Sequence, residues 1–215
     1  MDIGMNTDTC MSTDIGMTAD IGMSTDIGMT TDIGLNRALV RMILEHGQDY
    51  PWVMQDIGLL GLRLDDSREY RLHVWDPSGC IGEPPVHDHP FDFTSTIIAG
   101  EMTNTVYSQS PSGVEYSRVR YPPDDEDART CDPDTVRLSA TATTYREGER
   151  YSQLAHQLHD SRQLPGTVTV IRRSFIEVTE LTVCRRDEST WVSGRSRPAR
   201  VEEVKRLTAQ ALEWF

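Results

Sequence analysis

The 215-residue sequence lacks several features that would assign it to a well-known class of protein. It has no apolar run of about 18 residues, so no segment is expected to span a bilayer. The N-terminus has neither a basic segment nor an apolar core and is not expected to be a secretory signal. Basic residues are outnumbered by acidic ones, and the formal net charge is −13. Nucleic acids and anionic membranes both require basic patches, so neither is an expected partner.

Cysteine is also scarce. The four cysteines lie far apart in the sequence and form no Cys-x-x-Cys pair of the kind that binds zinc or exchanges disulfides. This pattern favours reduced thiols and predicts a cytoplasmic location. The low hydrophobic content of 37% and the chain length predict one folded domain with polar appendages.

Residues 2–35 form an internal repeat with a period of six residues, Asp-Ile-Gly-Met-x-Thr. The spacing is similar to the hexapeptide template of left-handed β-helices, which need several stacked coils to bury a core. The repeat would supply only about two coils, and every charge in it is negative. We therefore expect residues 1–35 to be a disordered or loosely docked tail, with a short β-annex or an oligomerisation strand as the alternatives.

The stretch Pro85–Gly100 carries the clearest chemical pattern. His87 and His89 are two residues apart, so on a strand both imidazoles leave the same face. Two imidazoles on one face can bind one divalent metal, each through one neutral ring nitrogen. The β-rich run that follows predicts the next strand, which the terminal glycine ends.

His-x-His followed after ten residues by Gly resembles the first motif of the cupin superfamily, small β-barrels with a metal at the barrel centre. The second cupin motif has one more His, eleven residues after a Gly, and Gly148 and His159 have this separation. For residues 36–215 the resemblance implies a mainly β fold. The expected form is an antiparallel cupin β-barrel (double-stranded β-helix or jelly roll) with an N-terminal and a C-terminal α-helix. It also implies a small-molecule substrate and a homodimer formed through barrel edge strands.

The sequence departs from the cupin pattern at the fourth ligand. The first motif usually has a glutamate four residues after its second His, and that position here is Phe93. Asp92 is adjacent but points to the other face of a regular strand. The resemblance therefore implies a metal site of three histidines: His87, His89 and His159. His156 lies three residues from His159 and faces the other side of a strand, so only one of the two is expected to be a ligand. The motif spacing favours His159, and His156 is the alternative.

Helices are expected at both ends of the 36–215 domain. Asn36 is a candidate N-cap for a helix with an apolar stripe that Gly47 ends. Pro198 is expected to open a second helix that runs to the last residue, Phe215.

Alternating apolar and polar residues predict strands across the middle of the chain. Strands are expected on both sides of a turn at 65–68 and of a hairpin at Pro111–Gly113. The acidic, proline-rich segment 122–134 is predicted to be a solvated loop, with a lid over the barrel mouth as the alternative.

Several polar and aromatic residues are candidates for the surroundings of the metal. Arg71, His73 and Trp75 alternate onto one face of a predicted strand. If that face points inward, Arg71 and Trp75 would bind substrate and His73 would act in catalysis; if outward, they form a polar surface. Phe93 is a further candidate substrate contact. Tyr107 is either an inward hydrogen-bond donor or acid, or an amphipathic strand residue.

Arg172 and Arg173 could clamp a substrate carboxylate with paired hydrogen bonds. Their alternative role is that of solvated charges at a strand end.

Three neutral ligands leave a bound metal its full positive charge and open positions for substrate, water or dioxygen. This pattern is similar to that of cupin dioxygenases acting on thiols, diketones or aromatic diols. The leading hypothesis is a non-haem iron(II) dioxygenase or oxygenase that acts on a small polar metabolite. One alternative is a zinc-dependent, non-redox cupin that isomerises, cleaves or rearranges an amino-acid derivative, as in hydrazine-forming enzymes. The other is a non-catalytic cupin that binds a ligand.

Overall fold

The computed structural model describes residues 36–55, 57–66, 69–79, 85–121, 130–176, 181–186 and 196–215. The repeat of residues 1–35, expected to be a disordered tail, lies outside the described residues, as do positions 122–129 of the acidic segment expected to be a loop or lid.

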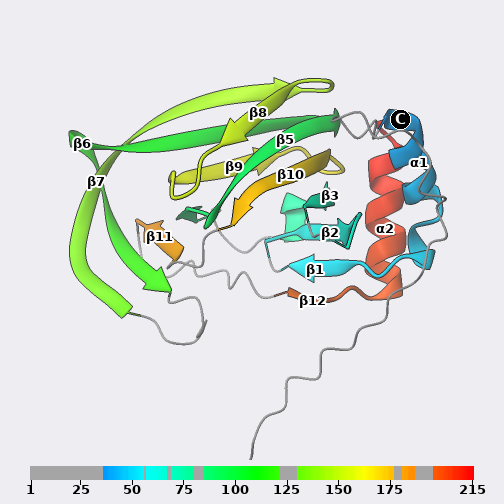
Figure 1. Cartoon of the computed structure of the whole chain (residues 1–215), viewed down its shortest axis with the longest axis horizontal. Coiled ribbons are helices and arrows are strands. Elements are labelled where there is room, and N and C mark those ends of the chain that lie inside the picture. Colours follow the sequence, from blue (N-terminus) through cyan, green and yellow to red (C-terminus); the bar gives the residue numbers. More distant parts are fainter. Residues whose placement is uncertain are drawn as a thin grey trace, which may run out of the picture. The chain divides into compact units, whose positions relative to one another are not determined.

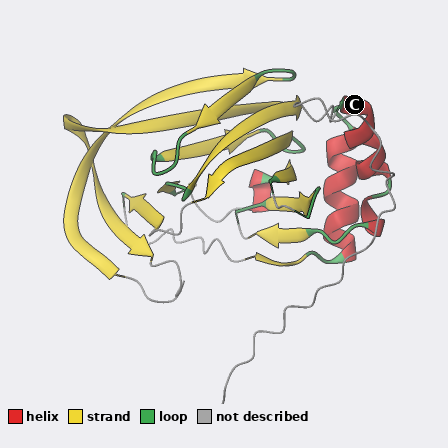
Figure 2. Ribbon diagram, viewed as in Figure 1, coloured by secondary structure: helices red, strands yellow, loops and turns green. Residues whose placement is uncertain are grey.

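The described part of the chain is mainly β, as the sequence predicts (Figure 2). The helices are α1 (Arg37–Glu45), α2 (Val201–Leu212) and two short 3-10 turns, η1 (Gly47–Asp49) and η2 (Pro77–Gly79). The strands are β1 (Val53–Gln55), β2 (Leu59–Arg63), β3 (Tyr70–Trp75), β4 (Val86–His87), β5 (Phe91–Ala99), β6 (Glu101–Tyr121), β7 (Thr130–Arg146), β8 (Arg150–Gln153), β9 (His159–Gln163), β10 (Val168–Ile176), β11 (Leu181–Arg185) and β12 (Ser196–Pro198). Neither α-helix of this part is long and apolar enough to cross a membrane.

The strands form two antiparallel sheets. One has seven strands in the order β12-β1-β2-β3-β10-β5-β8, and the other has five in the order β11-β4-β9-β6-β7, with β11 also pairing with β6 (Figure 1). The strands expected on the two sides of residues 65–68 are β2 and β3, which pair antiparallel; residues 67 and 68 lie outside the described residues. Closure of the two sheets into a barrel stays a prediction.

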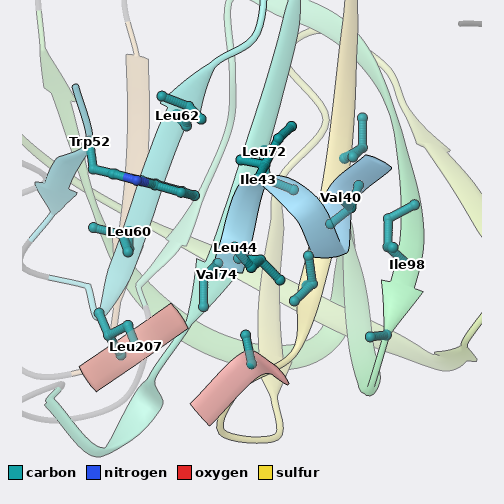
Figure 3. Packing of buried hydrophobic residues seen from close by; sticks show 14 of the residues in the cluster. Val40, Ile43, Leu44, Trp52, Leu60, Leu62, Leu72, Val74, Ile98 and Leu207 are labelled. Atoms are coloured by element: carbon teal, nitrogen blue, oxygen red, sulfur yellow. The ribbon is translucent and has the colours of Figure 1, made fainter. Parts of the chain in front are cut away.

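The outer face of the seven-stranded sheet is covered by the two helices, which lie beside each other (Figure 1). Val40, Ile43 and Leu44 of α1 pack with Leu72 and Val74 of β3 (Figure 3). Burial of each such side chain contributes about 1.5–3 kcal/mol, so this cluster anchors both helices to the sheet. Because strand side chains alternate, the β3 residues that alternate with Leu72 and Val74 point to the opposite, inner face.

The first helix begins as the sequence predicts. The Asn36 side chain accepts a hydrogen bond from the Leu39 amide at 2.9 Å, which caps α1. The second helix begins later than predicted, at Val201. Pro198 belongs instead to the edge strand β12, where it pairs with Val53, and proline is tolerated there because an edge strand does not need every amide.

The prediction of a hairpin at Pro111–Gly113 is wrong. Residues 101–121 form one long strand, β6, that runs with β7 in a curved ribbon (Figure 2). Gln109 and Val114 both align with Leu138 of β7, so the intervening residues form a bulge. The long pairing with β7 overrides the local turn preference of the Pro-Ser-Gly sequence.

An inner cluster lies between the sheets. Its members come from both sheets, and the buried ones are Phe93, Ile97, Met102 and Tyr151. Trp75, Phe91, Tyr145 and Ile171 pack against them. The face of each strand that carries these side chains is its inner face.

Gly100 ends β5 at a point where only glycine fits. Its φ is +85°, and a Cβ atom there would lie 2.6 Å from Thr167 Oγ1 and 2.9 Å from Thr167 Cα. Gly148 has a similar φ of +82° but no atom within 4 Å of an added Cβ. We therefore expect Gly100→Ala to lower the free energy of unfolding by about 2–4 kcal/mol, and the matched control Gly148→Ala by about 1 kcal/mol. Urea unfolding followed by tryptophan fluorescence measures both; equal losses would contradict the steric explanation.

Candidate metal centre

Three histidines meet beside the inner cluster. His87 in β4 is the cross-strand partner of His159 in β9, and His89 lies two residues after His87, the last residue of β4. One ring nitrogen of each histidine lies within 4.8 Å of those of the other two, so the three can hold a metal ion. The ring centroids of His87 and His159 are 4.7 Å apart, and His89 lies 4.8 Å and 5.2 Å from them, respectively.

Asp88 keeps His87 and His89 on one side of the chain. The Asp88 amide donates to the Thr182 carbonyl, and Asp88 Oδ1 accepts from the Thr182 amide at 2.7 Å. The buried Asp88 side chain thus continues the hydrogen bonding between β4 and β11. His87 and His89, on either side of Asp88 in the sequence, point to the other side of the chain.

Hydrogen bonds fix the tautomers of two of the rings. His87 Nδ1 is 3.0 Å from the Pro85 carbonyl oxygen, and His159 Nδ1 is 2.9 Å from Asn104 Oδ1. Both oxygens can only accept, so Nδ1 carries the proton in each ring and donates it. In a neutral imidazole this leaves the lone pair on Nε2, which is the atom a metal would bind.

All three histidines are held in the neutral form. Burial lowers the pKa of His87, although the Pro85 carbonyl and two nearby aspartates oppose the shift. Burial, together with the neighbouring His87 ring, holds the pKa of His159 well below its ordinary value. For His89, burial acts together with the other two rings, Arg173 and His73 to hold the pKa well below its ordinary range. Neutral imidazoles are ready to bind metal near neutral pH without losing a proton.

One of these ligand atoms is buried without a partner among the described residues. Within this part of the chain Nε2 of His159 makes no hydrogen bond, and the side chain is only 3% exposed. A buried polar atom without a partner costs about 1–3 kcal/mol, so such an atom needs a reason. A bound transition metal supplies one, and three imidazole nitrogens suit iron, zinc, nickel, manganese or copper.

Aromatic rings pack against this set. Phe91 stacks on His89 with centroids 5.0 Å apart, and Phe93 lies edge-on to His89 at 5.3 Å. Phe93 also contacts His159 at 5.7 Å, so an apolar ring occupies the position where a cupin glutamate is expected. Asp92 faces away, since its Oδ1 accepts from the Ala155 amide at 2.7 Å.

His156 is not part of the histidine set. It stands in a turn with φ of 58°, and its Nδ1 is 3.6 Å from Asp88 Oδ2. Its amide donates to the His89 carbonyl, which fixes the backbone that carries a ligand. Of the two alternatives left open by the sequence, the structure brings His159 to the site.

The inner face also receives three of the other predicted residues. His73 and Trp75 lie in contact with each other, with ring centroids 5.7 Å apart, and Trp75 packs on the inner cluster. Arg71 shares their face of β3 and lies close enough to contribute to the lowered pKa of His73. The structure therefore favours the inward alternative for this face of β3.

Tyr107 lies elsewhere. Its hydroxyl donates to Asp160 Oδ2 at 2.6 Å, and its ring contacts Tyr116 in a second cluster with Val86 and Leu138. Burial and the hydrogen bond to Asp160 raise its pKa. Asp160 follows His159 in β9 and points to the other face. The structure does not bring Tyr107 to the three histidines.

A polar chain behind His159 was not anticipated from the sequence. Asn104 Nδ2 donates to Gln153 Oε1 at 3.3 Å, and Gln153 Nε2 donates to the Gln157 carbonyl and side-chain oxygens at 3.1 and 3.0 Å. Asn104 and Gln153 are both buried. The chain holds Asn104 Oδ1 toward the His159 ring and thus fixes the orientation of a ligand.

Replacing Asn104 is expected to weaken metal binding without removing a ligand. In Asn104→Leu the His159 ring loses the oxygen that accepts its Nδ1 proton, and we expect about 10–100-fold lower affinity. Asn104→Asp, which keeps an acceptor oxygen, is expected to restore most of the affinity. Competition against a fluorescent zinc chelator measures both variants. Wild-type affinity in Asn104→Leu would show that the asparagine does not position the ring.

No protein-family model matches the sequence, and a search of curated proteins finds no match. A chain in the crystal structure of Drosophila melanogaster CENP-C bound to CAL1 is similar, with a TM-score of 0.31 and 10% identity over 70% of this chain and 95% of that chain. A cupin-like protein from Thermotoga maritima gives a TM-score of 0.25 and 8% identity over 73% of this chain and 87% of that chain. Both TM-scores are too low to establish a common fold.

Proposed function

We propose that this protein is a metal-dependent enzyme of the cupin type. Its barrel would hold non-haem iron(II) on His87, His89 and His159, and it would oxygenate a small polar metabolite. The observation that carries the proposal is the buried Nε2 of His159, which has no hydrogen-bond partner in the described part of the chain and lies beside two further neutral imidazoles. A ligand set without a carboxylate leaves a metal its full charge and open positions for substrate and dioxygen.

The surroundings favour redox chemistry over proton transfer. A zinc enzyme that isomerises or cleaves its substrate needs a general base with a pKa near the working pH. Among the described side chains on the inner face of β3, β5, β8, β9 and β10 there is no aspartate or glutamate. His73, the remaining inward histidine of this group, has its pKa lowered to about 3 by burial and by Arg71. In this proposal the chain's own residues bind and orient the substrate and exclude water from the site.

The test has two stages. Protein purified without chelators is analysed for metals by elemental mass spectrometry, and the iron(II)-loaded protein is then followed in an oxygen electrode with a panel of small metabolites. We expect about one metal per chain and substrate-dependent oxygen uptake. A firm preference for zinc and no uptake with iron would favour the non-redox alternative. If the protein holds no metal even after reconstitution, both the iron oxygenase and the zinc enzyme are overturned, and the ligand-binding protein is the hypothesis that is left.

A further inference from the structure

One buried carboxylate lies directly behind the histidine set. Asp160 follows His159 in β9, and only 5% of its surface is exposed. None of the ion pairs formed among the described residues involves this side chain. Within the same part of the chain its Oδ1 is buried without a hydrogen-bond partner. A buried carboxylate in such surroundings is unfavourable unless a cation lies nearby.

The other oxygen of this carboxylate has a neutral partner. The Tyr107 hydroxyl donates to Asp160 Oδ2 at 2.6 Å. Burial, followed by this hydrogen bond, raises the pKa of Tyr107, so the hydroxyl keeps its proton near neutral pH. A donating hydroxyl stabilises the ionised form of a carboxylate but brings no positive charge. The negative charge of Asp160 is therefore not balanced by Tyr107.

The strands place this charge close to two of the three candidate ligands. His159 precedes Asp160 in the sequence and pairs with His87 across β9 and β4. Side chains alternate along β9, so Asp160 points away from the histidines and is not a ligand itself. It lies near enough for its charge to act on the His87 ring. A negative charge that acts on this ring also attracts a metal cation bound to it.

The face that carries the histidines offers no such charge. Phe93 stands where a cupin glutamate is expected, and the described inner positions of β3, β5, β8, β9 and β10 hold no aspartate or glutamate. Three neutral imidazoles leave a divalent metal its full charge. A balancing charge for the metal must then come from the opposite face of the strands that carry the ligands.

Asp88 is the other buried acid on that opposite face, but both of its oxygens have partners. Oδ1 accepts from the Thr182 amide at 2.7 Å, and Oδ2 lies 3.6 Å from His156 Nδ1. Asp160 differs from Asp88 in having one oxygen without a partner in the described part of the chain. Of these two acids, Asp160 is therefore the one whose charge calls for a metal.

We propose that Asp160 is the counter-charge of the metal centre. Its carboxylate does not bind the metal; it attracts a divalent cation to the three histidines across the thickness of the sheet. In return, the bound cation relieves the cost of burying the carboxylate. The inference rests on the metal site that the proposed function also uses, but it does not depend on oxygenation.

The first test measures zinc affinity by competition against a fluorescent chelator. Asp160→Asn removes the charge and keeps an oxygen that can accept the Tyr107 proton. We expect this variant to bind zinc about tenfold more weakly than the wild type. The matched control Asp49→Asn removes one negative charge from the exposed turn η1 and is expected to bind zinc as the wild type does.

Urea unfolding then distinguishes a role in charge balance from a role in supporting the fold. Without metal, nothing balances the charge of Asp160, so metal-free Asp160→Asn is expected to be at least as stable as the metal-free wild type. The same zinc concentration is expected to stabilise the wild type more than the variant, because the wild type binds zinc more tightly. A residue that only supports the fold would instead lower the stability of the metal-free protein when it is replaced.

Two results would overturn the inference: wild-type zinc affinity in Asp160→Asn, or a metal-free variant that is less stable than the metal-free wild type. Failure of the variant to fold counts as the second result. Weakened zinc binding with undiminished metal-free stability would support the counter-charge even if the iron-loaded wild type takes up no oxygen, which would reject the oxygenase alone. A wild type that binds no zinc and no iron would overturn both.

Discussion

The double variant His87→Ala/His159→Ala is expected to lose metal binding, with an affinity for zinc or iron(II) at least about 1000-fold below that of the wild type. Each of these rings presents Nε2 to the site because its Nδ1 donates to a fixed oxygen. Loss of a group that only orients a ligand costs 10–100-fold, so loss of two ligands must cost more. Elemental analysis after dialysis against a weak chelator measures the occupancy of each protein.

His46→Ala is the matched control for this experiment. His46 is exposed and caps the C-terminus of α1, far in the sequence from the three ligands. The His46→Ala variant is expected to bind one metal per chain, as the wild type does. Equal metal content in the double variant and in this control would show that the metal binds elsewhere.

Acid is expected to destabilise the metal-free protein steeply. Burial, followed by the charge of Arg71, lowers the pKa of His73 from 6.5 to about 3. Below pH 6.5 the unfolded chain takes up a proton that the folded chain does not, so the free energy of unfolding falls with pH until the folded pKa is reached. At about pH 5 this one residue removes about 2 kcal/mol. The lowered pKa values of the three candidate ligands act in the same direction.

Urea unfolding of the metal-free protein between pH 7.5 and about pH 5 measures this loss, which is a large share of the 5–15 kcal/mol typical of a domain. The variant His73→Phe is expected to show a shallower dependence on pH, because it removes one of the proton-binding groups of the unfolded chain. His46→Ala again serves as the control. Stability that does not change over this range would mean that the histidines are protonated in the folded protein.

The sequence predicted the histidine set through two separate patterns. Strand alternation put His87 and His89 on one side, and the cupin-like spacing selected His159. The structure brings these three together because β4 and β9 pair His87 with His159, and His89 lies two residues after His87. The same alternation predicted the placement of Phe93 and Asp92 on opposite faces.

Other parts of the site depend on strand register, which no local pattern reveals. Asn104 is one polar residue among several in its strand, and it acquires a role only because β6 lies beside β9 and aligns it with Ser161. Pro111–Gly113 has the composition of a turn, yet its pairing environment with β7 makes it a bulge. In both places long-range pairing decides the outcome, and propensity describes only the isolated segment.

The pairing of His87 with His159 also has a kinetic consequence. The two residues are 159 − 87 = 72 positions apart, and β4 has only two residues, Val86 and His87. The site can therefore form only after a long loop has closed, which is entropically costly and places it late in folding. Interactions absent from the transition state mainly change the unfolding rate. A bound metal would consequently prolong the lifetime of the folded state and leave the rate of folding nearly unchanged.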